Sequence, residues 1–431
     1  MRILMTEGAG LTSRQVATQL DGLGHDVSAV VSDPLCLARF TRHVRTLHRV
    51  PDFGHDPLAW FDRMLQVAVA AQIDVIFPTQ EQVTVLSHQL PRLVAAGLAT
   101  AVPPFESLRR VQDKVSARRT LEELAVPQPH AIVVQSAADV DGWTSFPAFV
   151  KAPVGTGSTG VRRAADAGQL REAVAQFMAT GATQDGGVLV QEAVLGTFVM
   201  AQGVFDRGSL VAFHANERVR EGASGSASAK CSVALPVLRD ALARLGRALD
   251  WHGALSVDAI VADGQPLVID VNPRLVEPGN ARAAGTDLVS ALLAVALGVS
   301  TDPGPGPESR GGVRTHQLLM AILGAAQRTG RRRAVLGELA RAAVGRGVYA
   351  GSGEELLPAR GDWRTILLPI AAAVATLLRP RLWSFFTDGA VSRYALAPAG
   401  WRQLCSTPPL GSAPRAVDSR ETSAATASRA P

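Results

Sequence analysis

Short apolar runs alternate with segments of helical periodicity over the first hundred residues. Residues 2–6, 25–32 and 74–78 are short and mostly apolar, which is typical of buried strands. Residues 12–23 begin with a capping-box signature and continue with apolar residues at helical spacing. This order predicts a βαβ unit on a parallel sheet, in a Rossmann-like domain that we place at residues 1–105.

The next two hundred residues mix the two patterns in the manner of an α+β domain, which we place at residues 106–301. One helix is expected to open at Asp113-Lys114 and to end at Val126-Pro127. The expected strands are residues 146–151, 161–164, 188–190, 199–205, 254–261 and 266–272, and two further helices are expected at 169–178 and 235–249. The last two strands flank Asp263-Gly264 and should form a hairpin.

Beyond residue 301 the chain changes character. Its parts are a Pro/Gly-rich linker at 302–312, a mostly helical region at 313–407 and a tail at 408–431 with too few large apolar residues to order. Helices are expected at 313–326, 334–344 and 366–378. The last is the most apolar run, but its 13 residues are fewer than the roughly 20 that span a bilayer. A buried helix or an interface is favoured there over contact with a membrane.

Composition excludes several classes of protein. The chain has 431 residues, of which 47% are hydrophobic and 19% charged, so a largely disordered protein is excluded. A net charge of +5 over this length is too small for a dedicated nucleic-acid binder. Cys36, Cys231 and Cys405 are isolated, which excludes a disulfide scaffold and fits a reducing cytoplasm.

The basic residues are strongly biased. Only Lys114, Lys151 and Lys230 are lysines, against forty arginines. Where arginine fills nearly every basic position, a remaining lysine can mark a place that needs a compact ammonium group. Chance survival is the alternative for each of the three.

Two glycine-rich loops could bind phosphate. Residues 8–10 (GAG) follow the first strand, but Ser13 stands where a dinucleotide fingerprint has its third glycine, so a turn in a Rossmann-like domain is favoured. Residues 151–161 (KAPVGTGSTGV) contain P-loop glycine spacing without the Lys-Ser/Thr pair that completes it. The backbone N–H groups of this second loop could still cradle phosphate beside Lys151, unless it is a plain hairpin.

Polar residues cluster at the end of the predicted hairpin. Side chains alternate along a strand, so Asp270 and Asn272 share one face, while Leu267, Ile269 and Val271 are expected on the other. Two carboxylates and an amide oxygen suit Mg²⁺, provided Asp258 joins them. A two-residue turn would pair Asp258 with Ile269, whereas a three-residue loop, residues 263–265, would pair it with Asp270. The metal site requires the second register, and a solvated strand face is the alternative.

Taken in order, these motifs resemble the ATP-grasp superfamily over residues 1–298. The resemblance is to the branch of carbamoyl phosphate synthetase, biotin carboxylase and D-alanine–D-alanine ligase. It is carried by Asp113-Lys114, by FVK with the GTGSTG loop at 149–160, by VLVQEAVLG at 188–196 and by IDVNPR at 269–274. IDVNPR is similar to the family's I-E-x-N-P-R signature. The fold expected is therefore a Rossmann-like pre-ATP-grasp domain, a two-lobed ATP-grasp domain and a mostly helical C-terminal region.

The resemblance implies an ATP- and Mg²⁺-dependent, ADP-forming ligase that acts through an acyl phosphate, with Mn²⁺ as a possible substitute for Mg²⁺. It implies that Lys230 and residues 224–228 form a mobile loop over the triphosphate. The residues implied to bind ATP are Lys114, Lys151, Gly157, Ser158, Thr159, Gly160, Gln191, Glu192 and Val194; those implied to bind metal are Asp258, Asp270 and Asn272; and Arg274 joins Lys151 as a catalytic residue. The partners implied are a small carboxylate and an amine or related nucleophile.

Two departures from the family pattern keep alternatives open. The second metal ligand is Asp270 where Glu is usual, and Phe198 stands where many members carry a ribose-binding Glu. A nucleotide-binding regulatory protein with a decayed site is one alternative. A carboxyphosphate- or carbamoyl-phosphate-forming enzyme is another, although no glutaminase region or biotinyl domain is visible. We expect a cytoplasmic enzyme that does not bind nucleic acid, with contact to membranes not expected and a homodimer possible.

Overall fold

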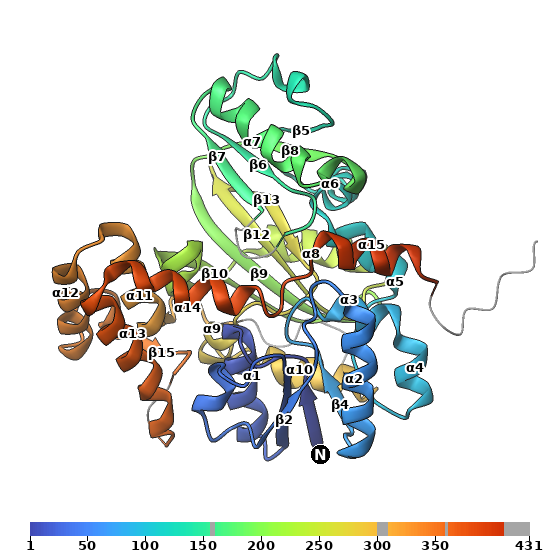
Figure 1. Ribbon diagram of the computed structural model, residues 1–431, viewed down its shortest axis with the longest axis vertical. Helices are drawn as coiled ribbons and strands as arrows, with labels where there is room; N and C mark the ends of the chain where they lie inside the picture. Colours follow the sequence, from blue (N-terminus) through green and yellow to red (C-terminus); the bar gives the residue numbers. More distant parts are fainter. Residues whose placement is uncertain (156–159, 300–308, 358–360, 409–431) are drawn as a thin grey trace, which may run out of the picture.

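The computed structural model describes residues 1–155, 160–299, 309–357 and 361–408. Figure 1 shows three sheets stacked along the long axis of the molecule. The lowest is a parallel sheet in the order β3-β2-β1-β4, with strands Thr46–Arg49, Asp26–Val31, Arg2–Met5 and Val75–Phe77. Helices α1 (Leu11–Gly22) and α2 (Pro57–Ala70) complete this domain. The predicted Rossmann-like start is confirmed.

The uppermost sheet belongs to a small lobe. Its antiparallel strands, in the order β5-β8-β6-β7, are Ala131–Val134, Val188–Glu192, Ala148–Lys151 and Val161–Ala164. Helix α7 (Ala167–Ala179) packs on them through Leu170, Val174 and Phe177, and α6 (Lys114–Glu123) leads into the lobe. The strands predicted at the two ends of the glycine loop are therefore present.

The central sheet has seven strands and lies between the other two. In spatial order they are β13 (Gln265–Asn272), β12 (Gly253–Ala262), β9 (Thr197–Asp206), β10 (Ser209–Glu221), β11 (Ala227–Ser232), β14 (Arg314–His316) and β15 (Gly353–Glu354). Helices α8 (Pro236–Ala248), α9 (Gly279–Ala283) and α10 (Leu288–Ala296) accompany it. The helix expected at 313–326 is partly wrong: residues 314–316 pair with β11, and the helix begins at Leu318.

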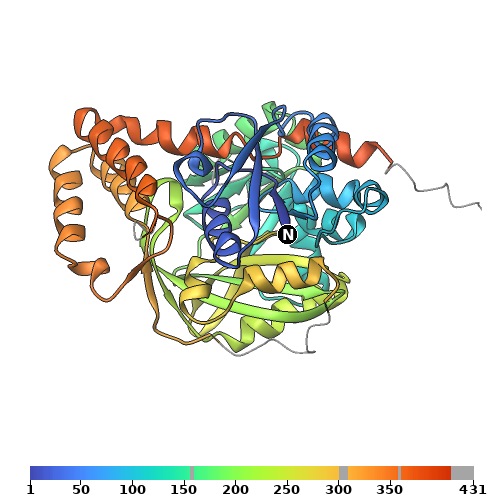
Figure 2. The same cartoon turned by 90° about the horizontal axis from the view of Figure 1, so that it is seen from below.

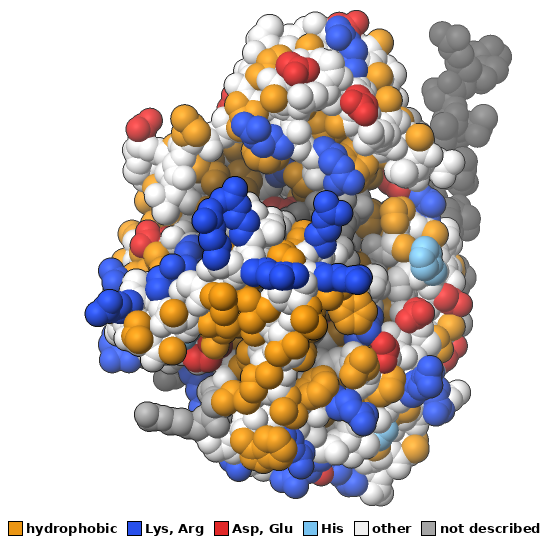
Figure 3. All heavy atoms as spheres, turned by 60° about the vertical axis from the view of Figure 1, so that its left-hand side comes forward, with side chains coloured by type: hydrophobic (Ala, Val, Ile, Leu, Met, Phe, Trp, Pro, Cys, Tyr) orange, Lys and Arg blue, Asp and Glu red, His pale blue; other side chains and the backbone are white. Residues whose placement is uncertain are grey.

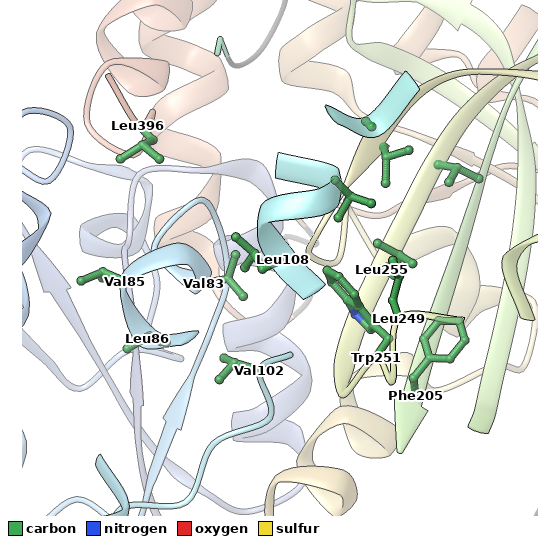
Figure 4. Packing of buried hydrophobic residues seen from close by; sticks show 14 of the residues in the cluster. Val83, Val85, Leu86, Val102, Leu108, Phe205, Leu249, Trp251, Leu255 and Leu396 are labelled. Atoms are coloured by element: carbon green, nitrogen blue, oxygen red, sulfur yellow. The ribbon is translucent and has the colours of Figure 1, made fainter. Parts of the chain in front are cut away.

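One hydrophobic core joins the parallel sheet to the central sheet. Figure 4 shows Leu108 of α5 (Phe105–Gln112) lying between Val83 of α3 (Val83–His88) and the buried indole of Trp251. The indole Nε1 donates to the carbonyl of Ala254 at 3.0 Å, so its one polar atom is satisfied inside the core. Phe205 of β9 packs on the other side of this cluster. The shared core holds the two domains in one arrangement.

The C-terminal helices stand mostly to one side of the sheets, as Figures 1 and 2 show. They are α11 (Leu318–Thr329), α12 (Arg332–Ala343), α13 (Leu367–Leu378) and α14 (Trp383–Val391). Helix α15 (Pro398–Ser406) instead lies beside the first domain, where Trp401 meets Phe105 edge to face. Among the described residues, no helix is both long and apolar enough to cross a bilayer. The predicted tail lies outside the described residues, apart from residue 408.

Candidate active site

The hairpin of β12 and β13 brings Asp258 opposite Asp270. The predicted pairing is therefore confirmed, but its predicted cause is wrong. The turn contains only Asp263-Gly264, and the extra residue lies in a β-bulge, where the register shifts between Asp258 and Ala259 and leaves Ile269 without an opposite partner. A bulge and a longer loop both add one residue to one strand, so either can place the two carboxylates side by side.

The bulge also changes which residues of β13 face the core. The sequence predicts one apolar face made of Leu267, Ile269 and Val271. Val268 and Val271 are instead the residues buried in the core, while Ile269 lines the cavity beside Asp270. The bulge interrupts the alternation of side chains between those two core positions. The bulge therefore brings the apolar side chain of Ile269 and its backbone carbonyl into the site.

Lys151 uses that carbonyl. It is the last residue of β6, in the small lobe, and its Nζ donates to the Ile269 carbonyl oxygen at 2.7 Å. The side chain is 6% exposed, so its ammonium group is largely shielded from solvent. Burial lowers the pKa of Lys151 to about 8, opposed by the negative charge of Asp270. The ammonium group is thus held between the two lobes at a cost in desolvation.

Lys114 approaches the same carboxylate from a helix N-terminus. Asp113 caps α6 by accepting from the Ser116 N–H at 2.8 Å, which sets the direction in which Lys114 leaves the helix. The Lys114 Nζ lies 3.3 Å from Oδ1 of Asp270 and donates to the Gly155 carbonyl at 3.4 Å. Two of the three lysines therefore converge on one carboxylate pair.

The two adjacent carboxylates of Asp258 and Asp270 repel each other when both are ionised. Burial, and after it the adjacent Asp270 carboxylate, raise the pKa of Asp258 to about 7. The positive charges of Arg274, Lys151 and Lys114 oppose this rise without cancelling it. The described residues contain no group of three or more His, Cys, Asp or Glu placed to hold a metal. Two carboxylates with the nearby amide of an asparagine are nevertheless the oxygen donors that Mg²⁺ accepts when phosphate and water complete its shell.

Arg274 also lies at this site and is oriented by a carboxylate from the first domain. Its Nε and Nη2 lie 3.2 and 3.1 Å from Oε1 of Glu81, in the segment after β4. Both side chains are largely buried, and Arg274 lines the cavity together with Asn272. The predicted site residues Asp258, Asp270, Asn272 and Arg274 are therefore brought together in one place.

The residues expected to bind nucleotide line the same cavity. Gln191, Glu192 and Val194 lie along it, and the Glu192 carboxylate accepts from the His130 N–H at 2.9 Å. Phe198 also lines it, with the Arg218 guanidinium 4.2 Å above the centre of its ring.

Two glycines close the hairpin of the glycine-rich loop after β6. A Cβ on Gly155 would lie 3.1 Å from the Cα of Gly160, a tight contact, so this close approach favours a glycine. The amide of Ala152 also donates to the Gly160 carbonyl at 2.8 Å, which holds the two sides of the loop together. Gly157, Ser158 and Thr159 lie outside the described residues.

A second charged cluster, formed by Lys230 and two glutamates, was not predicted from the sequence. Lys230 lies in β11, 2% exposed, with its Nζ 2.5 Å from Glu277 and 3.0 Å from Glu355. Burial alone would lower the pKa of Lys230, but the two carboxylates raise it above its ordinary value. The expectation of a mobile loop is wrong for this residue, which is held in a strand. The scarcity of lysine marked Lys230, but nothing in the sequence links it to a glutamate 125 positions away.

The three lysines, Arg274 and the Asp258–Asp270 pair all line one cavity of about 1180 Å³. Its lining combines the charged residues with apolar side chains from the first domain and from α11, α13 and α14. Figure 3 shows a hollow between the small lobe and the C-terminal helices, with Lys and Arg side chains around it. The arrangement can neutralise a polyphosphate and hold a second ligand beside it.

This architecture is similar to that of known proteins. Residues 111–278 match the ATP-grasp domain family. The chain is also similar in fold to the biotin carboxylase domain of Hydrogenobacter thermophilus 2-oxoglutarate carboxylase, solved as a dimer with MgADP, ADP and bicarbonate. The TM-score is 0.58 at 14% identity, covering 73% of each chain.

Two further structures show the same likeness. Campylobacter jejuni biotin carboxylase, solved as a β-γ-ATP complex, matches at a TM-score of 0.56 and 16% identity over 69% of this chain and 71% of that one. N5-carboxyaminoimidazole ribonucleotide synthetase from Thermus thermophilus matches at 0.53 and 19%, over 73% and 81%. At these identities the likeness establishes a shared fold.

Proposed function

Because the chain carries an ATP-grasp domain, we propose that it is a Mg-ATP-dependent ligase that joins a carboxylate to an amine or a related nucleophile. The carboxylate oxygen attacks the γ-phosphorus of ATP, the bond to the β-phosphate oxygen breaks, and ADP and an acyl phosphate result. The nucleophile then adds to the acyl carbon, loses its proton and expels phosphate. The single observation that carries this proposal is the convergence of Lys114 and Lys151 on the Asp258–Asp270 pair.

The metal and phosphate roles follow from the charges. Asp258, Asp270 and Asn272 would hold one or two Mg²⁺ ions, which supply charge neutralisation on the phosphates when bound. Lys151 is already directed between the lobes by the Ile269 carbonyl, so its ammonium needs little reorganisation to meet a phosphate oxygen. Phosphoryl transfer relies mainly on positioning and charge neutralisation, and these residues provide both.

The nucleotide assignments rest on the cavity lining and the order of motifs. We assign the adenine contacts to Gln191, Glu192 and Val194, which line the cavity at the end of β8. The loop residues Gly157, Ser158, Thr159 and Gly160 are assigned to the phosphates. The His130 N–H engages the Glu192 carboxylate, so that residue would meet the base through its backbone.

Arg274 and Lys230 are the candidates for holding the second substrate. Both are buried cations on the cavity lining, and each is oriented by at least one carboxylate. Arg274 would hold the acyl phosphate or the acceptor carboxylate. A pair of buried cations also suits a small oxyanion such as bicarbonate, which makes carboxyphosphate formation the second candidate function.

An ADP-release assay with Mg-ATP tests the proposal. The acceptor panel contains carboxylic acids with and without amines, and bicarbonate alone. Release that needs both an acid and an amine supports ligation, and release with bicarbonate alone supports the second candidate. ADP release with no acceptor dependence in any arm, and no loss in Asp270→Ala, would refute both.

A further inference from the structure

The cavity has a part that the phosphate chemistry does not use. Leu319, Met320 and Leu323 of α11 line it, together with Leu368 of α13 and Phe386 of α14. These residues lie beyond residues 111–278, which match the ATP-grasp family. The C-terminal helices therefore add an apolar wall to a site whose remaining lining combines charged residues with other apolar side chains.

Helix α11 places this apolar wall directly beside the charged cluster. Gln317, just before the helix, donates from its Nε2 to Glu277 and, at 3.0 Å, to Glu355. Leu319 and Met320 follow within one turn. The helix is seated closely, because a Cβ on Gly324 would lie 2.8 Å from the carbonyl carbon of Gly222. The apolar wall and the buried ammonium of Lys230 are consequently parts of one rigid surface.

The volume of the cavity and the chemistry of its lining indicate which substrate it could hold. The cavity of about 1180 Å³ exceeds the roughly 300–1,000 Å³ of an ordinary small-molecule site. ATP would occupy the charged part, and the apolar part remains. Resting on the proposed function, we propose that the carboxylate substrate carries a large apolar body, an acyl chain or an aromatic group, with its carboxylate toward Arg274 and Lys230 and its body against α11.

A homologous series of acids tests this inference. Straight-chain carboxylates from acetate to dodecanoate are compared by kcat/KM for ADP release, and binding is measured by calorimetry with Mg-ADP, which requires no turnover. Both affinity and kcat/KM should rise by up to roughly fourfold per methylene, the factor that corresponds to burying one CH₂ group. Phe385→Ser, at a cavity-lining but exposed residue, should reduce the gain for long acids only. Val94→Ser, at an exposed residue outside the cavity lining, is the control.

The outcomes separate the two proposals. Binding of long acids without ADP release would support the apolar site and refute the ligase. Turnover that is best with acetate or a polar acid, or no difference in binding between short and long acids, would overturn the apolar site and leave the ligase standing.

An exposed apolar face on α13 carries a second inference. Ile366, Ile370, Val374 and Leu378 recur at intervals of four residues and are 45%, 54%, 52% and 65% exposed. The opposite side of the helix, including Ala372 and Ala373, packs into the bundle. The expectation was a buried helix or an interface: α13 is buried on one side only, and its other side exposes an apolar face that fits an interface.

Positive charge lies at both ends of this face. Residues 313–407 contain thirteen arginines and five carboxylates. Arg364 and Arg379 are exposed at the two ends of α13, and the Arg332 Nη2 donates to the Leu378 carbonyl at 2.8 Å, which brings the arginines of residues 331–333 to its end. Figure 3 shows hydrophobic side chains gathered over the C-terminal helices, bordered by Lys and Arg side chains.

We infer that the α13 face docks on an anionic lipid surface. An apolar helical stripe bordered by arginines suits a bilayer interface, where the stripe enters the acyl boundary and the guanidinium groups meet the headgroups. Trp363, exposed at the start of the stripe, is the residue type that favours this interface. The charge excess favours lipid over a second copy of this chain, whose own face would be equally positive.

Vesicle co-sedimentation tests the docking. The protein should bind vesicles containing phosphatidylglycerol at least tenfold more tightly than pure phosphatidylcholine vesicles, and high salt should weaken the binding. The double variant of Ile370→Ser and Val374→Ser should lose it, whereas the double variant of Val94→Ser and Val237→Ser, also at exposed valines, should keep it. Absence of vesicle binding, or light scattering that shows a dimer dissociated by Ile370→Ser, would overturn the inference.

Discussion

Replacing Asp258 by asparagine should stabilise the metal-free protein and abolish its response to Mg-ATP. Burial, with the adjacent Asp270 carboxylate, raises the pKa of Asp258 from 3.8 to about 7. A difference of that size corresponds to about 4 kcal/mol of free energy stored against ionisation. Because the side chain is only half-buried, solvent reduces the cost, and we expect Asp258→Asn to raise the free energy of unfolding by about 2–4 kcal/mol at pH 8.

The raised pKa of Asp258 makes the stability of the folded protein fall as the pH rises. A carboxyl group whose folded-state pKa lies above its unfolded-state value keeps its proton longer in the folded protein. Between about pH 4 and pH 7 the folded protein therefore binds more protons than the unfolded chain, and stability falls as the pH rises. Above about pH 7 both states are ionised and the cost is constant. The advantage of the variant should grow by about 2–3 kcal/mol from pH 5 to pH 8.

The assay is urea unfolding with a chelator at several pH values between 5 and 8. Subtracting the wild-type curve from that of Asp258→Asn removes the contribution of every other titrating group. Asp263→Asn, at the exposed turn of the same hairpin, should show no difference at any pH. A pH-independent difference for Asp258→Asn, or a variant less stable than the wild type at pH 8, would refute the argument from burial.

The same variant tests the metal assignment. A ligand at a hundred times its dissociation constant stabilises the folded state by about 2.7 kcal/mol. Mg-ATP at that level should raise the melting temperature of the wild type and leave Asp258→Asn unchanged. A full response in the variant would remove Asp258 from the metal site.

Three further predictions concern the other charged groups. Asp270→Ala and Asn272→Ala should abolish substrate-dependent ADP formation with the fold intact by circular dichroism, and wild-type turnover in either would remove that residue from the metal site. Lys151→Arg should lower kcat/KM for ATP more than tenfold, at least about 1.4 kcal/mol, because a planar guanidinium is longer and wider than the ammonium that meets the Ile269 carbonyl, and Lys151→Met should lower it further. Full activity in the arginine variant would show that this lysine survived by chance. Lys230→Met should lower the free energy of unfolding by about 3–5 kcal/mol, since it leaves two carboxylates without their buried cation, and a melting temperature equal to that of the wild type would contradict that reading.

In the β12–β13 hairpin, the chemistry of a metal site predicted which residues pair but not how the backbone pairs them. The need for two carboxylates on one face correctly identified the Asp258–Asp270 pair. It could not distinguish a longer loop from a bulge, because both add one residue and leave the same alternating pattern in the sequence. The difference matters, since the bulge leaves Ile269 without an opposite partner, and the Ile269 carbonyl accepts from Lys151.

The order of secondary-structure elements and motifs along the chain could be predicted from the sequence. The alternating strands and helices of the first domain, the strands on either side of the glycine loop and the ATP-grasp order of motifs all depend on neighbouring residues, through side-chain periodicity and turn chemistry. These signals lie within windows of about ten to twenty residues, so the sequence contained them in full.

Tertiary structure decided what depends on distant segments. The ion pairs of Lys230 join β11 to residues 277 and 355, and the apolar wall of the cavity comes from helices more than a hundred residues beyond the glycine-rich loop. The same holds for α13: its composition indicated an apolar helix, but only the packing of the bundle determined which half remained exposed. Whether a residue is buried depends on the segments that pack against it. The periodicity of apolar residues shows which side of a helix is apolar, but it does not show what packs on that side.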